Sequence, residues 1–216
     1  TVLATPPCLA QPVRRRRLAL VVRGRHRKPP LTFRLVCARP GEAVHARGAV
    51  AAVDAAANTA VGSKALFSNT TGRANSAFGL QSAYSNTTGI HNTSIGYQTL
   101  YSNTTGSFNM AAGYHALYSN TSGYSNVAVG IGALYNNIND HNLVAVGDSA
   151  LYYQTDLDDY NTALGSKALF SSTTGYYSTA AGYQALYSNT TGYDNTALGY
   201  KALNSNKVGY QNTAIG

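Results

Sequence analysis

Three carboxylates stand close together in the second half of the chain, at Asp156, Asp158 and Asp159. Clustered carboxylate oxygens are ligands that Ca²⁺ prefers, so this segment is a candidate metal site. Its spacing departs from the D-x-D-x-D-G pattern of calcium loops. We therefore interpret it as a solvated acidic loop, with calcium binding as the alternative.

Asn-x-Ser/Thr sequons form a second set of candidate sites. Such an asparagine carries a glycan on the surface of a secreted eukaryotic protein. The alternative is compositional, because Asn and Thr are turn formers and create sequons by their frequency alone. Most of the sequons fall at one position of a predicted turn, which would place sugars in a row. The acceptors are Asn69, Asn86, Asn92, Asn103, Asn120 and Asn189.

The other reactive side chains show no catalytic pattern. His91, His115 and His141 occupy different positions of the repeat described below, which indicates surface residues. Cys8 and Cys37 fit no metal-binding spacing. The sequence contains no nucleophile–base constellation, no paired-cysteine metal motif and no phosphate loop. We therefore expect no enzyme activity, no catalytic residue and no cofactor.

The elements that must position these residues come from two compositions. Residues 1–50 carry a charge of +10 and hold all 6 prolines and both cysteines, whereas residues 51–216 carry −2 and hold all 17 tyrosines. We expect residues 1–50 to be a basic leader that is disordered or foreign to the fold; a transit peptide or a nucleic-acid-binding arm is the alternative. Residues 51–216 are the expected repeat domain, for which we expect no nucleic-acid partner. No apolar run approaches the ~20 residues of a membrane span.

Glycine recurs every 17 residues in the second segment. One extra residue interrupts the series, whose members are Gly62, Gly79, Gly96, Gly113, Gly130, Gly147, Gly165, Gly182, Gly199 and Gly216. The unit reads N-T-A-(L/I/V)-G-Y-x-A-L-Y-S-N-T-T-G-Y-x, which is too short for a helical repeat of ~33–45 residues. The period predicts an all-β parallel β-roll or β-solenoid of about nine coils. Each coil should hold two short strands, at Asn-Thr-Ala-Leu and Ala-Leu-Tyr, and a turn at S-N-T-T-G.

Equivalent positions of successive coils should stack ~4.7–4.8 Å apart, so each repeat position becomes a column. Two apolar columns form the predicted core. The first precedes the glycine and contains Val61, Phe78, Ile95, Val129, Val146, Leu164 and Leu198. The second contains Leu66, Leu100, Leu117, Leu134, Leu151, Leu169, Leu186 and Leu203, with Ala83 as an exception. A small alanine column, such as Ala116 and Ala133, lets the backbones approach closely.

Two further columns are polar or aromatic. An asparagine column that includes Asn58, Asn75 and Asn109 should form an amide ladder between coils. An aromatic column should face outward, where other chains could cover it, and this favours a homo-oligomer. Its members are Phe67, Tyr84, Tyr101, Tyr118, Tyr135, Tyr152, Phe170 and Tyr187.

The N-T-A-(I/L/V)-G-x-x-A pattern, as in Asn195–Ala202, resembles the head repeats of trimeric autotransporter adhesins, whose motif is close to S-x-A-I-G-x-x-A. The unit here resembles a 17-residue variant with a longer S-N-T-T-G turn, as is also found in tail-fibre-like surface proteins. The resemblance covers residues 58–216. It implies a left-handed parallel β-roll, a trimer of intertwined chains, and attachment to host or matrix surfaces.

These patterns indicate a structural or adhesive fibre at the cell surface or outside the cell. Repeated columns would bind a host, matrix or glycan surface through avidity. The alternatives are a glycan-coated fibril and an ice- or polysaccharide-binding solenoid. In the solenoid, the paired threonines of the turn, such as Thr70–Thr71 and Thr104–Thr105, would form a hydroxyl lattice. The coil that contains the extra residue also has Leu143 in place of asparagine, which makes it a candidate ligand-contacting bulge.

Overall fold

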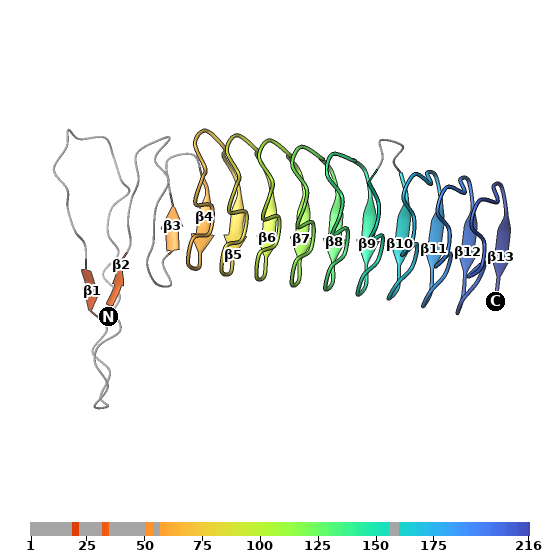
Figure 1. The fold of residues 1–216 in the computed structure, drawn as a ribbon. Coiled ribbons are helices and arrows are strands. Elements are labelled where there is room, and N and C mark those ends of the chain that lie inside the picture. The colour runs from red at the N-terminus through yellow and green to blue at the C-terminus, as the bar shows by residue number, and fades with distance from the viewer. Residues whose placement is uncertain (1–18, 22–31, 35–50, 54–56, 156–159) are drawn as a thin grey trace, which may run out of the picture.

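The computed structural model describes residues 19–21, 32–34, 51–53, 57–155 and 160–216. Most of the basic leader and the candidate calcium ligands Asp156, Asp158 and Asp159 lie outside these ranges. The described residues form strands and turns, and the repeat winds into a β-solenoid with one strand per coil (Figure 1).

The strands form two sheets. In the small sheet, β1 (Ala19–Val21) pairs antiparallel with β2 (Thr32–Arg34). In the eleven-stranded sheet, β3 (Ala51–Val53) pairs antiparallel with β4, and every later pair is parallel and follows chain order. The parallel strands are β4 (Thr59–Val61), β5 (Ser76–Phe78), β6 (Thr93–Ile95), β7 (Met110–Ala112), β8 (Val127–Val129), β9 (Val144–Val146), β10 (Thr162–Leu164), β11 (Thr179–Ala181), β12 (Thr196–Leu198) and β13 (Thr213–Ile215).

The register of the sheet keeps each repeat position in its column. Ala145 pairs with Ala163 across the extra residue, just as Ala128 pairs with Ala145 and Ala163 pairs with Ala180 where no residue is added. The insertion therefore leaves the strand register intact, because the added length is taken up outside the strands. The predicted all-β solenoid with its 17-residue coils is confirmed.

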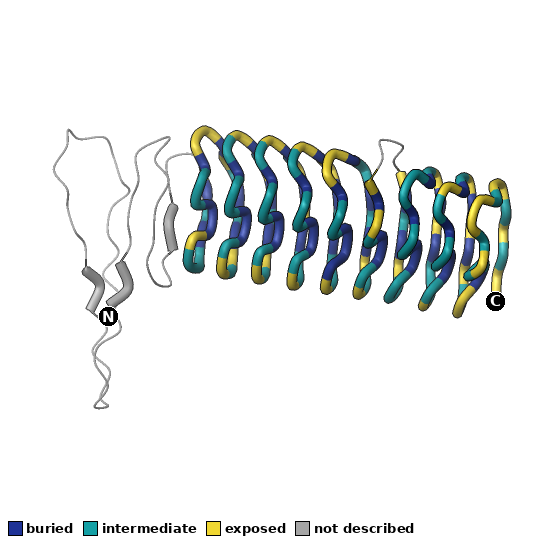
Figure 2. Tube along the Cα trace, in the orientation of Figure 1, coloured by how far each residue is buried: buried dark blue, intermediate teal, exposed yellow. Residues whose placement is uncertain are grey.

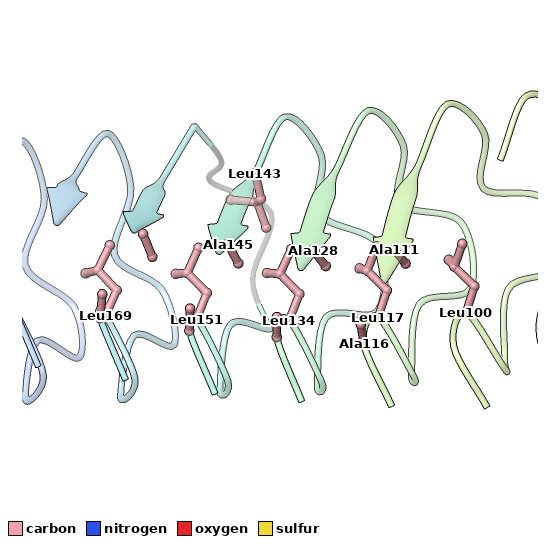
Figure 3. Close-up of a cluster of buried hydrophobic side chains, with 14 of the residues drawn as sticks. Leu100, Ala111, Ala116, Leu117, Ala128, Leu134, Leu143, Ala145, Leu151 and Leu169 are labelled. Atoms are coloured by element: carbon pink, nitrogen blue, oxygen red, sulfur yellow. The ribbon is translucent and has the colours of Figure 1, made fainter. Parts of the chain in front are cut away.

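The inward face of each strand carries its middle residue. Ala77, Ala111, Ala128 and Ala145 are fully buried, and the leucine column packs against them from the opposite side of the coil (Figures 2 and 3). Leucines 100 to 186 of this column are fully buried, whereas Leu66 is slightly and Leu203 partly exposed. The prediction that the leucine column lies in the core is confirmed.

The other predicted core column lies on the outside. Val61 and Val129 are half-buried, and Phe78, Ile95, Val146, Leu164 and Leu198 are exposed. Successive side chains of a strand point to opposite faces, so an inward alanine forces the residues on either side of it outward. The prediction that this column lies in the core, which rested on its apolar character alone, is wrong.

The predicted second strand, at Ala-Leu-Tyr, is a chain of turns. Lys64 and Leu66 have φ values of 59° and 50°, and the later coils repeat this left-handed pattern at both positions. Alternating handedness curls the chain and keeps it short, while N–H groups still bond the next coil, as from Leu66 to the Ser82 carbonyl at 3.0 Å. A left-handed leucine costs about 1–2 kcal/mol, and burial of its side chain offsets this cost.

Candidate functional site

The solenoid presents its residues as columns, so the candidate functional features are columns as well. The first is the asparagine column that opens each strand. Asn109 donates from Nδ2 to the Gly123 carbonyl of its own coil at 2.8 Å, and its Oδ1 accepts the Asn126 N–H of the next coil at 3.0 Å. The predicted ladder is therefore present. Most of its amides link backbone groups, whereas Asn212 also donates to Asn195 Oδ1 and Asn161 to Gln154 Oε1. Its members are buried through most of the array.

Replacing Asn109 with alanine removes both bonds. It leaves the Asn126 N–H buried without its side-chain acceptor, whereas the Gly123 carbonyl keeps the Asn120 Nδ2 donor at 3.1 Å. We expect unfolding in urea, followed by circular dichroism, to show a loss of about 1–3 kcal/mol in stability. Asn139→Ala is the matched control, because Asn139 is an exposed asparagine in the same part of the array. Equal midpoints for the two variants would contradict this role of the ladder.

A second asparagine column runs through the turn. It contains most of the asparagines that the sequence predicted as glycosylation sites. Asn103 donates from Nδ2 to Asn86 Oδ1 of the preceding coil at 2.8 Å and to the Gly106 carbonyl at 3.0 Å. Asn69, Asn120 and Asn189 are buried in the same way. This column forms the amide-to-amide ladder. The sequence feature that could have identified it is the turn position that the sequons share.

The sequon asparagines are therefore not placed as glycosylation would require. All six acceptors are buried, including Asn92, which belongs to the first ladder. A glycan is attached at Nδ2, and these Nδ2 atoms donate hydrogen bonds inside the coil. The expectation of a row of sugars on exposed turns is wrong for the folded solenoid.

The aromatic column stacks on itself. Neighbouring rings from Phe67 to Tyr187 lie 5.1–5.5 Å apart between centroids, with interplanar angles of 2–24°. Each ring is half-buried, and the ring faces are covered by the rings above and below. Burial raises the pKa of Tyr118 and Tyr152 above the ordinary tyrosine value, with a smaller contribution from neighbouring tyrosines. The column thus stabilises coil-to-coil stacking within one chain.

The three histidines within the described residues, His91, His115 and His141, lie apart from one another. His115 stands over the aromatic column near Tyr118, and its Nε2 lies 2.8 Å from Gln98 Oε1. Burial lowers the pKa of this imidazole below its usual value. His91 stacks on Phe108 and His141 on Tyr124. Each of these three histidines packs as part of an aromatic pair or cluster.

The turn threonines use half of their hydroxyls internally. The first threonine of each pair donates to a carbonyl of the next coil, as Thr87 does to Thr104 at 2.9 Å. The second threonine is exposed in most pairs, as Thr88 is, and half-buried at Thr174. A lattice built from both hydroxyls of the T-T pairs is therefore wrong, because the first row serves the coil.

The outer face of the sheet is the most regular exposed surface. Each strand presents its first residue, often threonine, and its third residue, which is aliphatic or aromatic in most coils. The third residues of the strands form the column that was predicted to lie in the core and that the structure places outside. We call it the outer apolar column. It extends over the ten in-register strands β4 to β13.

The irregular coil breaks the first ladder without opening the core. Leu143 is fully buried in the asparagine column, and its N–H still donates to Asn126 Oδ1 at 3.0 Å. In the turn just before this coil, buried Asp140 takes the place of the turn glycine, and within the coil buried Gln154 takes the place of the turn asparagine. Gln154 Oε1 accepts from the Ser172 hydroxyl at 3.0 Å. The described part of this coil is thus rebuilt around the insertion.

Metal ligands are not gathered in the described part of the chain, where no three His, Cys, Asp or Glu side chains form a group that could hold an ion. Across the same ranges, no helix is long and apolar enough to span a bilayer.

The solenoid assignment rests on the chain's own periodicity and geometry. Comparison with family models, curated proteins and solved structures found no match to this chain.

Proposed function

We propose that this chain is a structural or adhesive part of an extracellular or cell-surface fibre. In this proposal it acts as a homo-oligomer and attaches to a surface through repeated columns. The observation that carries the proposal is the outer apolar column, which runs along ten in-register strands of a rod. The resemblance of the repeat to trimeric adhesin heads supports the same function. The repeat domain needs no cofactor or catalytic residue for this role.

A second copy of the chain is the occupant that fits the outer apolar column. An exposed or half-buried apolar side chain recurs once per coil, so two copies of the column share the same repeat and match along their whole length. The strand residues of this face, such as Thr93 and Ile95 or Thr162 and Leu164, are uncharged. Association there would bury a continuous apolar strip without desolvating any charge, which is favourable.

Charge on this column tests the oligomer. Ile95→Asp places a carboxylate on the proposed interface, whereas Ile138→Asp places one on a turn; the two isoleucines are 46% and 47% exposed. We expect light scattering to give an oligomer for the unchanged chain and for Ile138→Asp, and a smaller species for Ile95→Asp. A monomeric unchanged chain, or the same mass for all three, would contradict the proposal.

Attachment by avidity is tested by changing the number of coils. Deleting residues 75–91 removes one whole coil and keeps every column in register. Retention of beads coated with the chain on immobilised matrix proteins and polysaccharides should fall steeply with each deleted coil, because the binding contributions multiply. Retention that is absent, or independent of coil number, would contradict an adhesive role. Thermal hysteresis of a solution of the chain would instead support an ice-binding solenoid. Exposed strand threonines such as Thr179 and Thr196 would then contact the ice.

A further inference from the structure

We propose that consecutive coils can be joined covalently by dityrosine bonds within one chain, at tyrosines stacked on the solenoid surface. The principal site is the column Tyr176, Tyr193 and Tyr210, which we call the surface tyrosine column. Its ring centroids lie 5.0 Å apart at both steps, with interplanar angles of 6° and 3°. A covalent link there would tie one coil to the next. This inference stands on the geometry of one chain and does not depend on the proposed fibre.

The backbone holds the rings of this column in register. The Asp194 N–H donates to the Tyr176 carbonyl, and the Gln211 N–H donates to the Tyr193 carbonyl, each at 3.1 Å. These bonds fix the vertical spacing of the phenols before any reaction takes place. Preorganised neighbours react at high effective concentration, so a radical formed on one ring meets the next ring of its column first.

The reaction needs a one-electron oxidant, for which a haem peroxidase with hydrogen peroxide serves. Each of two phenols loses one electron and one proton. The two phenoxyl radicals then join through a carbon–carbon bond between two Cε carbons, each of which neighbours the Cζ carbon that carries the oxygen. The hydrogens on those carbons leave as protons and the oxygens are protonated again, which restores both phenols. In total two tyrosines lose two hydrogens, and one peroxide becomes two waters.

The exposure of Tyr210 separates the Tyr193–Tyr210 step from the aromatic column, whose rings are all half-buried. The coupling rings must pivot from face-to-face stacking until their edges meet. Tyr210 is 56% exposed, and Tyr176 and Tyr193 are partly exposed, so solvent leaves room for this movement. The rings of the aromatic column pack against the coil, and burial there raises the pKa of Tyr118 and Tyr152.

Two exposed tyrosine pairs offer the same geometry at another column. Tyr97 and Tyr114 lie 5.3 Å apart at 9°, and Tyr183 and Tyr200 lie 5.6 Å apart at 13°. They are secondary sites, because their rings are farther apart and less parallel than those of the surface tyrosine column.

The test oxidises the full chain with peroxidase and peroxide, measures dityrosine fluorescence, and maps linked peptides by mass spectrometry. We expect peptides joined at Tyr193–Tyr210 and Tyr176–Tyr193, each two hydrogens lighter than the sum of its parts. Tyr193→Phe keeps the stacked ring but removes the phenol, so both peptides should disappear. Tyr187→Phe is the matched control, since Tyr187 stacks on Phe170 in its column, and it should leave both peptides at full yield.

Isotope labelling identifies the chain that supplies each ring. Labelled and unlabelled chains are unfolded together, refolded as a mixture and then oxidised. Peptides that carry one isotope composition throughout would support coupling within a chain. Mixed-isotope peptides would overturn the proposal, and so would the absence of dityrosine. It would also be overturned if the chain oxidised in denaturant gave the same yield of dityrosine at these positions as the folded chain.

Discussion

Gly113→Ala should lose more than about 4 kcal/mol of stability, which places it among the rare severe point substitutions. Gly113 has φ near +132°, a region that is essentially restricted to glycine. A Cβ at this position would lie 2.4 Å from the Gly130 carbonyl oxygen of the next coil. The clash is with backbone, so no side chain can move to relieve it. Loss of far-UV signal and faster hydrogen exchange in β7 and β8 would reveal the opened coils.

Gly132→Ala is the matched control for this substitution. Gly132 also has positive φ, at +62°, but its column contains Gln98, His115 and Ser149 in other coils. The nearest atom to an added Cβ belongs to the Tyr152 ring at 3.2 Å, and a ring edge can give way. We expect a stability close to that of the unchanged chain. If both alanines cost the same, close stacking of the glycine column would not be the cause.

Leu134→Ala should cost about 2–5 kcal/mol, because it opens a cavity in the column of large apolar side chains in the core. Leu134 is fully buried between the leucines of the neighbouring coils and faces the inward alanines of the strands (Figure 3). Small alanines cannot fill the space that the leucine leaves. Urea unfolding followed by circular dichroism should show an earlier transition, with the largest change in hydrogen exchange in the adjacent coils, since each coil contacts only its neighbours.

Ile131→Ala provides the comparison for the leucine cavity. Ile131 lies three residues away and is 60% exposed, so truncation removes little buried surface. A change within about 0.5 kcal/mol is expected for such a surface position. A loss as large as that of Leu134→Ala would show that the core extends beyond the inward columns described here.

The sequence by itself determined the periodic architecture. A glycine every 17 residues admits one coil per repeat, and the column model that follows from it predicted the parallel stacking, the leucine core, the alanine column and the first asparagine ladder. It also marked the coil with the extra residue. These features are local and recur in each copy of the unit. A pattern that recurs in nearly every copy is unlike a chance match, which would occur in one copy alone.

Tertiary structure decided which side of each element faces inward. The repeat positions of Leu164 and Leu169 are both occupied by apolar residues throughout the array. Only Leu169 is buried, because the strand places Ala163 inward and Leu164 outward. Sequons such as Asn103 match a glycosylation motif, but the wound coil aims their amides at the preceding coil. The left-handed leucines turn an expected strand into a corner. Facing direction depends on how the backbone winds between repeats, and that winding is set by contacts 17 residues apart, which single positions in the sequence do not encode.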